Sequence, residues 1–186
     1  MIAADKKYLL SLARKTLQAY FSQKKLSVSA PPAGSPLSAP RGCFVTLQTR
    51  SGQLCGCVGN IEPSGPLYLA VQDNSLAAAL ADDRFLPLTE TELAEIKIEI
   101  SVLTEPRFLS FSSPDDLLNQ LRSGRPGVIL SQGRQSATYL PQVWEVLPEP
   151  EVFLSSLSEK AGLKPMAWHE PDTRIAVYEA EHFVEA

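Results

Sequence analysis

The sequence contains few of the residues that usually carry metal or acid–base chemistry. It has two histidines, His169 and His182, and three cysteines, at positions 43, 55 and 57. An odd cysteine count argues against a secreted domain held by disulfides and favours reduced thiols, so we expect a cytoplasmic protein. The Cys-x-Cys spacing also differs from the Cys-x-x-Cys of common zinc sites. We therefore predict neither a metal site nor a cofactor, with a set of three thiolates and one histidine as the weaker alternative.

Other absences narrow the class of protein further. No apolar run reaches the roughly 18 residues that a membrane span requires, and the first residues show no signal-peptide pattern. The net charge of −4 and the pI near 5.3 disfavour a dedicated nucleic-acid-binding protein, which usually has a basic excess. No Ser/His/Asp triad, phosphate-binding loop or dinucleotide motif is present. The 186 residues, 44% of them hydrophobic, suit one globular domain.

Hydrophobic spacing and turn residues predict an α+β fold with a mainly antiparallel sheet flanked by helices. One domain is expected over residues 1–186, with a Pro-rich connector loop at 26–41. Helices are expected at 4–25, 66–81, just after Thr89, 113–124 and 149–161. Strands are expected at 43–49, 53–59, 96–102, 127–130, 136–140 and 174–184.

The hairpin around Arg50-Ser51-Gly52 decides where the three thiols lie. With a three-residue loop that ends in a left-handed Gly52, Thr49 faces Gln53. In that register Val45 faces Cys57 and Leu47 faces Cys55, and all three thiols share one face of the sheet. A two-residue loop would instead shift the register by one residue and move Cys43 to the opposite face.

The second strand of this hairpin carries a family resemblance. Its sequence, Leu54-Cys55-Gly56-Cys57-Val58-Gly59, resembles the Leu-Arg-Gly-Cys-Ile-Gly signature of the AMMECR-type domain, which supplies protein A of the AmmeMemoRadiSam group. Further blocks are similar to the family in the expected order: Gly42 to Leu47, Asp82 to Leu88, Ile98 to Leu103, Leu140 to Trp144, and 153–163.

The resemblance implies a fold with a larger and a smaller subdomain and a groove between them. It also implies a modification pathway with a Memo-like protein and a radical S-adenosylmethionine (radical SAM) enzyme as possible partners, although no reaction is assigned to the family. The sequence departs from the signature where Cys55 replaces the arginine. An arginine there would bind a carboxylate or phosphate through two hydrogen bonds, which a cysteine cannot do.

Cys57 is the candidate catalytic residue. In the functional interpretation it is a nucleophile or redox thiol, and Gly56 and Gly59 let a ligand approach the backbone. In the structural interpretation Cys57 is a small hydrophobic residue of a buried strand. An activated thiol needs a base or a cation beside it, and the candidates are Arg41, Arg84, His169 and His182.

Four further residues are candidates for the groove, each with a structural alternative. Asp82 and Arg84 either line it as an acid and an anion clamp, or form an ion pair that fixes their loop while Phe85 fills the core. Glu99 is expected to face solvent unless its face of the sheet is the floor of the groove. Gln142 presents an amide to a ligand beside Trp144, which is itself more typical of a core. Both histidines are expected at the surface.

These residues support three hypotheses of function. The first is an enzyme, or a component of one, that acts through Cys57. The second is a non-catalytic module that docks a Memo-like or radical SAM partner. The third is RNA binding through the basic residues of the 4–25 helix, for which a solvated helix face is the favoured alternative: Lys6, Lys7, Arg14, Lys15, Lys24 and Lys25.

Overall fold

A computed structural model describes residues 1–24, 30–32, 34–63 and 65–185. The chain divides into two compact units. The first unit contains Met1–Leu103 and the C-terminal stretch from Glu181, and the second contains Thr104–Ala180. No helix in the described ranges is long and apolar enough to cross a membrane.

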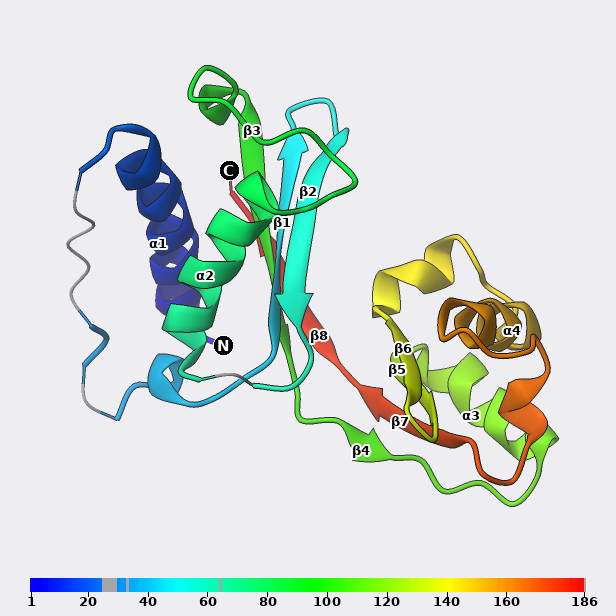
Figure 1. The fold of residues 1–186 in the computed structure, drawn as a ribbon. Helices are drawn as coiled ribbons and strands as arrows, with labels where there is room; N and C mark the ends of the chain where they lie inside the picture. The colour runs from blue at the N-terminus through cyan, green and yellow to red at the C-terminus, as the bar shows by residue number, and fades with distance from the viewer. Residues whose placement is uncertain (25–29, 33, 64, 186) are drawn as a thin grey trace. The chain divides into compact units, whose positions relative to one another are not determined.

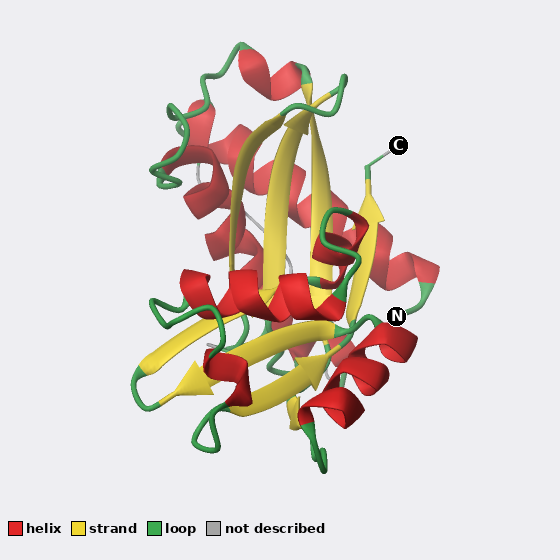
Figure 2. Ribbon diagram, turned by 90° about the vertical axis from the view of Figure 1, so that its right-hand side faces the viewer, coloured by secondary structure: helices red, strands yellow, loops and turns green. Residues whose placement is uncertain are grey.

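The first unit is a four-stranded sheet with two helices on one face (Figure 1). The strand order is β2-β1-β3-β8. The strands are β1 (Cys43–Thr49), β2 (Leu54–Asn60), β3 (Ile96–Leu103) and β8 (Ala180–Val184), and the helices are α1 (Ala3–Phe21) and α2 (Leu67–Leu80). The long strands of this sheet lie side by side in Figure 2. β1 pairs antiparallel with both β2 and β3, so β2 is an edge strand.

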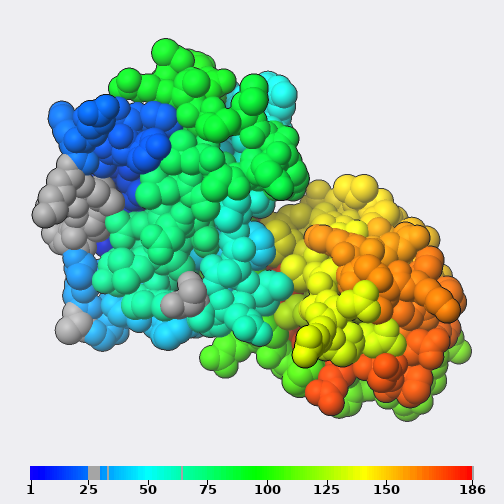
Figure 3. Space-filling model, viewed as in Figure 1, coloured from blue at the N-terminus to red at the C-terminus, as the bar shows by residue number. Residues whose placement is uncertain are grey.

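The alternation of the central strands separates a buried face from a polar one. Val45 and Leu47 of β1 and Ile98 and Ile100 of β3 have no exposed surface and pack against the two helices. Helices α1 and α2 pack against each other, and Figure 3 shows them in contact at the surface of this unit. Alternate residues of a strand point to opposite faces, so the polar residues between these apolar ones face away from the helices.

The second unit has its own sheet and its own core. Its strand order is β4-β7-β5-β6, with β4 (Arg107–Phe108), β5 (Gly127–Gln132), β6 (Gln135–Tyr139) and β7 (Arg174–Tyr178). Helices α3 (Pro114–Gly124) and α4 (Pro150–Lys160) supply much of the rest of the core. The rings of Trp144 and Phe153 stack there at 3.8 Å, and the indole N–H of Trp144 donates to the carbonyl of Pro126 at 2.7 Å.

The predicted α+β class is confirmed, and most helix ends agree with their sequence signals. Ser113 accepts a hydrogen bond from the N–H of Asp116 and begins α3. Thr89 and Glu92 form the reciprocal bonds of a capping box, although the helix that follows is only a 3₁₀ turn, Glu92–Ala94. The α1 helix ends at Phe21 rather than at residue 25, and residues 25–29 of that prediction and of the connector lie outside the described residues.

The expected strand at 174–184 is wrong in one respect. It is two strands, because the pairing changes at Glu179: β7 belongs to the sheet of the second unit and β8 to the sheet of the first. The apolar run of β7, residues 175–178, leads into β8 without a proline, glycine or other turn signal, so the sequence does not mark the change of partner. The two-residue strand β4 was not expected, since two residues are too few to show a period.

Candidate functional site

The register of the β1–β2 hairpin places the three cysteines in three different environments. Gly52 is left-handed and Thr49 faces Gln53, as predicted, but a β-bulge between Leu47 and Gln48 then shifts the pairing by one residue. Cys57 consequently lies opposite Thr46 rather than Val45. The prediction that all three thiols share one face is therefore wrong, because the bulge inserts an extra residue into β2.

Each cysteine is a free thiol with its own surroundings. Cys43 is fully buried on the helix side, and burial raises the pKa of its thiol to about 11. Cys55 packs against the same core at the bulge. Cys57 points to the other face, where it is half-buried, and its Sγ lies 3.3 Å from the hydroxyl of Thr46, which donates to it. Among the described residues, no group of three histidines, cysteines or carboxylates is placed to hold a metal ion.

The two glycines beside Cys57 have packing roles. A Cβ on Gly56 would lie 2.0 Å from the carbonyl oxygen of Ala78, so only glycine lets α2 approach the sheet there. A Cβ on Gly59 would lie 2.4 Å from the ring of Phe44, which covers this position of the edge strand. The interpretation that both glycines admit a ligand is thus replaced by close approach of the protein's own groups.

Asp82 and Arg84 bind the peptide groups of Cys57 from the loop that follows α2. An Asp82 carboxylate oxygen accepts the backbone N–H of Cys57 at 2.8 Å, and Arg84 donates to the carbonyl of Cys57 at 3.1 Å. The same two side chains form an ion pair, with Arg84 Nη2 and Nε at 2.7 and 2.9 Å from the carboxylate. Because β2 is an edge strand, these bonds replace those that a further strand would make at Cys57.

This arrangement favours the structural interpretation of the Asp82–Arg84 pair over an exposed acid and anion clamp. The Asp82 side chain exposes only 5% of its surface, whereas that of Arg84 exposes 58%. Hydrogen bonds from Arg84 hold the pKa of Asp82 well below its usual range, with a smaller contribution from the N–H of Cys57 and against the opposing effect of burial. Phe85 does not fill the core as expected: it is half-buried beneath the Arg84 guanidinium, and Leu88 is the buried residue of this loop.

A row of polar side chains crosses the sheet from Cys57. Thr46 pairs with Cys57 on one side and with Glu99 on the other, so thiol, hydroxyl and carboxylate lie on one face of three adjacent strands. The next row on the same face pairs Gln48 with Lys97. We call this surface the polar face and define it by six residues: Thr46, Gln48, Cys57, Lys97, Glu99 and Ser101.

Several side chains of the polar face have no hydrogen-bond or ion-pair partner among the described residues. The carboxylate of Glu99 and the ammonium of Lys97 are half-buried and make no ion pair or hydrogen bond with a described residue. Ser101 exposes only 3% of its surface, and its hydroxyl has no partner in the described part of the chain either. Glu99 was among the predicted candidates, whereas Thr46, Lys97 and Ser101 were not. Their sequence signal is the polar half of the strand alternation, which also marks ordinary solvent-facing strands.

The remaining candidates lie away from this row. Gln142 belongs to the second unit, where its Oε1 is buried without a partner in the described residues. Trp144 is a core residue, as expected. His169 and His182 are both exposed, as predicted, and Arg41 is exposed in the first unit.

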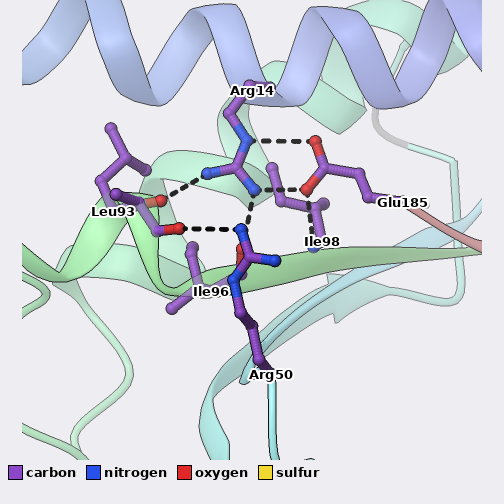
Figure 4. Close-up of polar contacts among 7 residues, drawn as sticks. Arg14, Arg50, Leu93, Ile96, Ile98 and Glu185 are labelled. Atoms are coloured by element: carbon purple, nitrogen blue, oxygen red, sulfur yellow. Dashed lines mark hydrogen bonds and ion pairs between the residues drawn. The ribbon is translucent and has the colours of Figure 1, made fainter.

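Arg14 has a structural role in the first unit (Figure 4). Its guanidinium pairs with Glu185, which follows β8, through two hydrogen bonds, one of 3.0 Å from Nε. It also donates to the carbonyls of Leu93 at 2.6 Å and Ile96 at 2.9 Å. Lys6 of the same helix pairs with Glu181 at 2.7 Å. Two of the six basic residues considered for RNA binding are therefore neutralised by carboxylates, and Lys25 lies outside the described residues.

Comparison with known proteins places the chain in a family. Residues 10–183 match the profile of the AMMECR1 family. The chain belongs to the AMMECR1 family. It is 39% identical over 185 residues to Protein MK0488 of Methanopyrus kandleri, a match that spans 96% of this chain and 87% of that protein. It is 34% identical to Protein MJ0810 of Methanocaldococcus jannaschii over 96% of this chain and 89% of that one.

A solved structure supports the AMMECR1 fold directly. The crystal structure of the uncharacterized protein PH0010 from Pyrococcus horikoshii has a TM-score of 0.84 to this chain and 32% sequence identity, and the match covers 96% of this chain and 90% of that one. The names of these AMMECR1 relatives state no activity. The family therefore establishes the fold of this chain.

Proposed function

We propose that this AMMECR1 protein is an enzyme, or a component of one, whose reacting group is the Cys57 thiol. One observation carries the proposal: Cys57 is held at both of its backbone groups while its sulfur stays half-buried beside a hydroxyl donor. A nucleophile gains from being fixed in position by elements that do not themselves react. Asp82 and Arg84 are positioning residues in this proposal, and the polar face binds the substrate.

The surroundings of the sulfur support a reactive thiol rather than a packing residue. Cys43, with its buried sulfur and raised thiol pKa, has the environment of an inert cysteine. Cys57 differs because its neighbour across the strand is a hydroxyl and because the Arg84 guanidinium binds its carbonyl.

The partners implied by the resemblance fit an enzyme component. In this proposal the protein works in the cytoplasm with a Memo-like protein and a radical SAM enzyme, and Cys57 supplies the thiol step of a shared modification pathway. Docking of those partners without chemistry at Cys57 is the competing proposal.

Alkylation of the native protein tests the function. The protein is treated with iodoacetamide between pH 5 and 9, and each cysteine is followed by peptide mass spectrometry, with metal content assayed on the same sample. We expect Cys57 to be labelled selectively in the folded state, with Cys43 labelled only after unfolding. Cys55→Ser is the matched control and should leave the labelling of Cys57 unchanged. Protection of Cys57 until the protein is denatured would overturn the proposal and favour the docking role.

A further inference from the structure

The polar residues beside Cys57 indicate which class of substrate the site would bind. Glu99 lies in the same row as Cys57, with only Thr46 between them. Two strand spacings put the Cα atoms of Cys57 and Glu99 roughly 10 Å apart, with both side chains on the same side. The Thr46 side chain lies between them, so a ligand that meets both the sulfur and the carboxylate would lie over Thr46.

The charged side chains around this row differ in how strongly they can attract a charged ligand. The Arg84 guanidinium is already bound to the Asp82 carboxylate, so this pair presents little net charge to a ligand. Asp83 beside it is exposed and acidic. Lys97 is on the same face of β3 as Glu99, but it pairs with Gln48 in the next row, about 7 Å further along the strand. His182 of β8 points to this face by alternation with Phe183, which packs in the helix-side core.

Among the described residues of this face, Glu99 is therefore the charged residue without a partner that lies nearest to Cys57. We infer that the site takes a substrate with an ammonium or other organic cation close to its reacting atom, and that Glu99 binds this cation. Ser101, two residues along β3 on the same face, offers a nearly buried hydroxyl to the same ligand. This inference rests on the proposed function, because it assigns a substrate class to the Cys57 site.

Thiol probes that differ only in charge test the inference. The probes are 2-aminoethyl methanethiosulfonate, which is cationic, 2-sulfonatoethyl methanethiosulfonate, which is anionic, and the neutral methyl reagent. In each case the Cys57 thiolate attacks the sulfenyl sulfur, a disulfide forms and methanesulfinate leaves. Rates at Cys57 are measured at low ionic strength by mass spectrometry of the intact chain and its peptides.

We expect the cationic probe to react faster than the anionic one. Glu99→Gln should lower the ratio of the two rates roughly five-fold, as expected for one charge at this range in a high-dielectric surrounding. Both charged-probe rates are divided by the neutral-probe rate of the same variant, so that a change in the reactivity of the thiol itself is not counted as a change in charge preference. Glu99→Asp keeps the charge and should retain most of the preference, whereas Lys97→Gln should increase it. Glu95→Gln removes the same charge from a side chain that is 74% exposed at the start of the strand, and should leave the ratio within about 1.5-fold because of screening.

The outcomes separate the inference from the proposed function. If the neutral probe labels Cys57 but the ratio shows no cation preference, or does not depend on Glu99, the substrate class is wrong and the thiol function stands. If the neutral probe fails to label Cys57 in the folded protein, the proposed function fails and the inference falls with it.

Discussion

The carboxylate of Asp82 accepts the backbone N–H of Cys57 at 2.8 Å, across 25 residues of sequence. Asp82 also forms an ion pair with Arg84, which donates to the carbonyl of Cys57. Together the two side chains make both hydrogen bonds that an adjacent strand would make with Cys57. The two most distinctive blocks of the sequence, the Cys-Gly-Cys strand and the Asp-Asp-Arg loop, therefore form one structural unit. The unit blocks strand addition at Cys57, where an edge strand otherwise has open backbone groups.

Replacement of the Asp82 carboxylate should destabilise the first unit. In Asp82→Asn an amide N–H₂ group replaces one of the two acceptor oxygens and faces donors, namely the N–H of Cys57 or the guanidinium of Arg84. We expect a loss of about 1–3 kcal/mol in the free energy of unfolding, the range for a buried polar group left without its partner. Urea unfolding followed by circular dichroism measures it. Asp83→Asn removes the same charge next to it and should cost less than about 0.5 kcal/mol. Equal losses in the two variants would contradict a specific role for Asp82.

The contribution of Asp82 should also depend on pH in a defined direction. Its pKa is lowered in the folded protein, first by hydrogen bonds from Arg84. A carboxyl whose folded pKa lies below its unfolded value of about 3.9 contributes fully above that value, and the contribution is lost as the pH falls toward the folded pKa. The stability difference between wild type and Asp82→Asn should thus be constant near neutrality and shrink below about pH 4. Unfolding curves from pH 2.5 to 7 measure this difference. A difference that grows as the pH falls would refute the assignment.

Much of the fold could be predicted because its signals are local. The 96–102 strand, the helix that begins at Ser113 and the left-handed Gly52 each depend on a few neighbouring residues, and the structure agrees with all of them. The change of sheet at Glu179 could not be predicted, since strand partners are chosen by tertiary packing.

The candidate site was less predictable for the same reason. Cys57 stood out by its sequence, but its neighbours depend on one bulge, which moved it from Val45 to Thr46 and so to the opposite face. Gly56 and Gly59 suggested ligand access because glycine leaves space, whereas that space is filled by Ala78 and Phe44. Both contacts come from packing that sequence spacing does not encode.

Gly56 should be among the least replaceable residues of the first unit. In Gly56→Ala the new methyl group would meet the carbonyl oxygen of Ala78 at 2.0 Å, a backbone atom that cannot rotate away. Either α2 or β2 must then move, and we expect a loss of about 1–3 kcal/mol in the free energy of unfolding, the usual cost of overpacking. Gly65→Ala is the matched control, because a Cβ there meets nothing within 4 Å. Thermal unfolding of the two variants checks this, and a Gly56→Ala protein as stable as Gly65→Ala would show that the helix is not held close to the strand.

Arg14 should hold the C-terminal stretch of the chain to the first unit. Its guanidinium joins α1 to Glu185 and to the carbonyls of Leu93 and Ile96, and both partners of the ion pair expose only about a fifth of their side chains, 21% and 20%. In Arg14→Met the aliphatic stem is kept while Glu185 and two carbonyls lose a donor, so we expect a loss of about 1–3 kcal/mol in the free energy of unfolding. Lys15→Met alters the adjacent, exposed position and should change stability by less than about 0.5 kcal/mol. Hydrogen exchange adds a local readout: the backbone N–H of Ile98, which donates to Glu185 at 3.1 Å, should exchange faster in Arg14→Met than in Lys15→Met. Unchanged protection of Ile98 would mean that Glu185 keeps its place without Arg14.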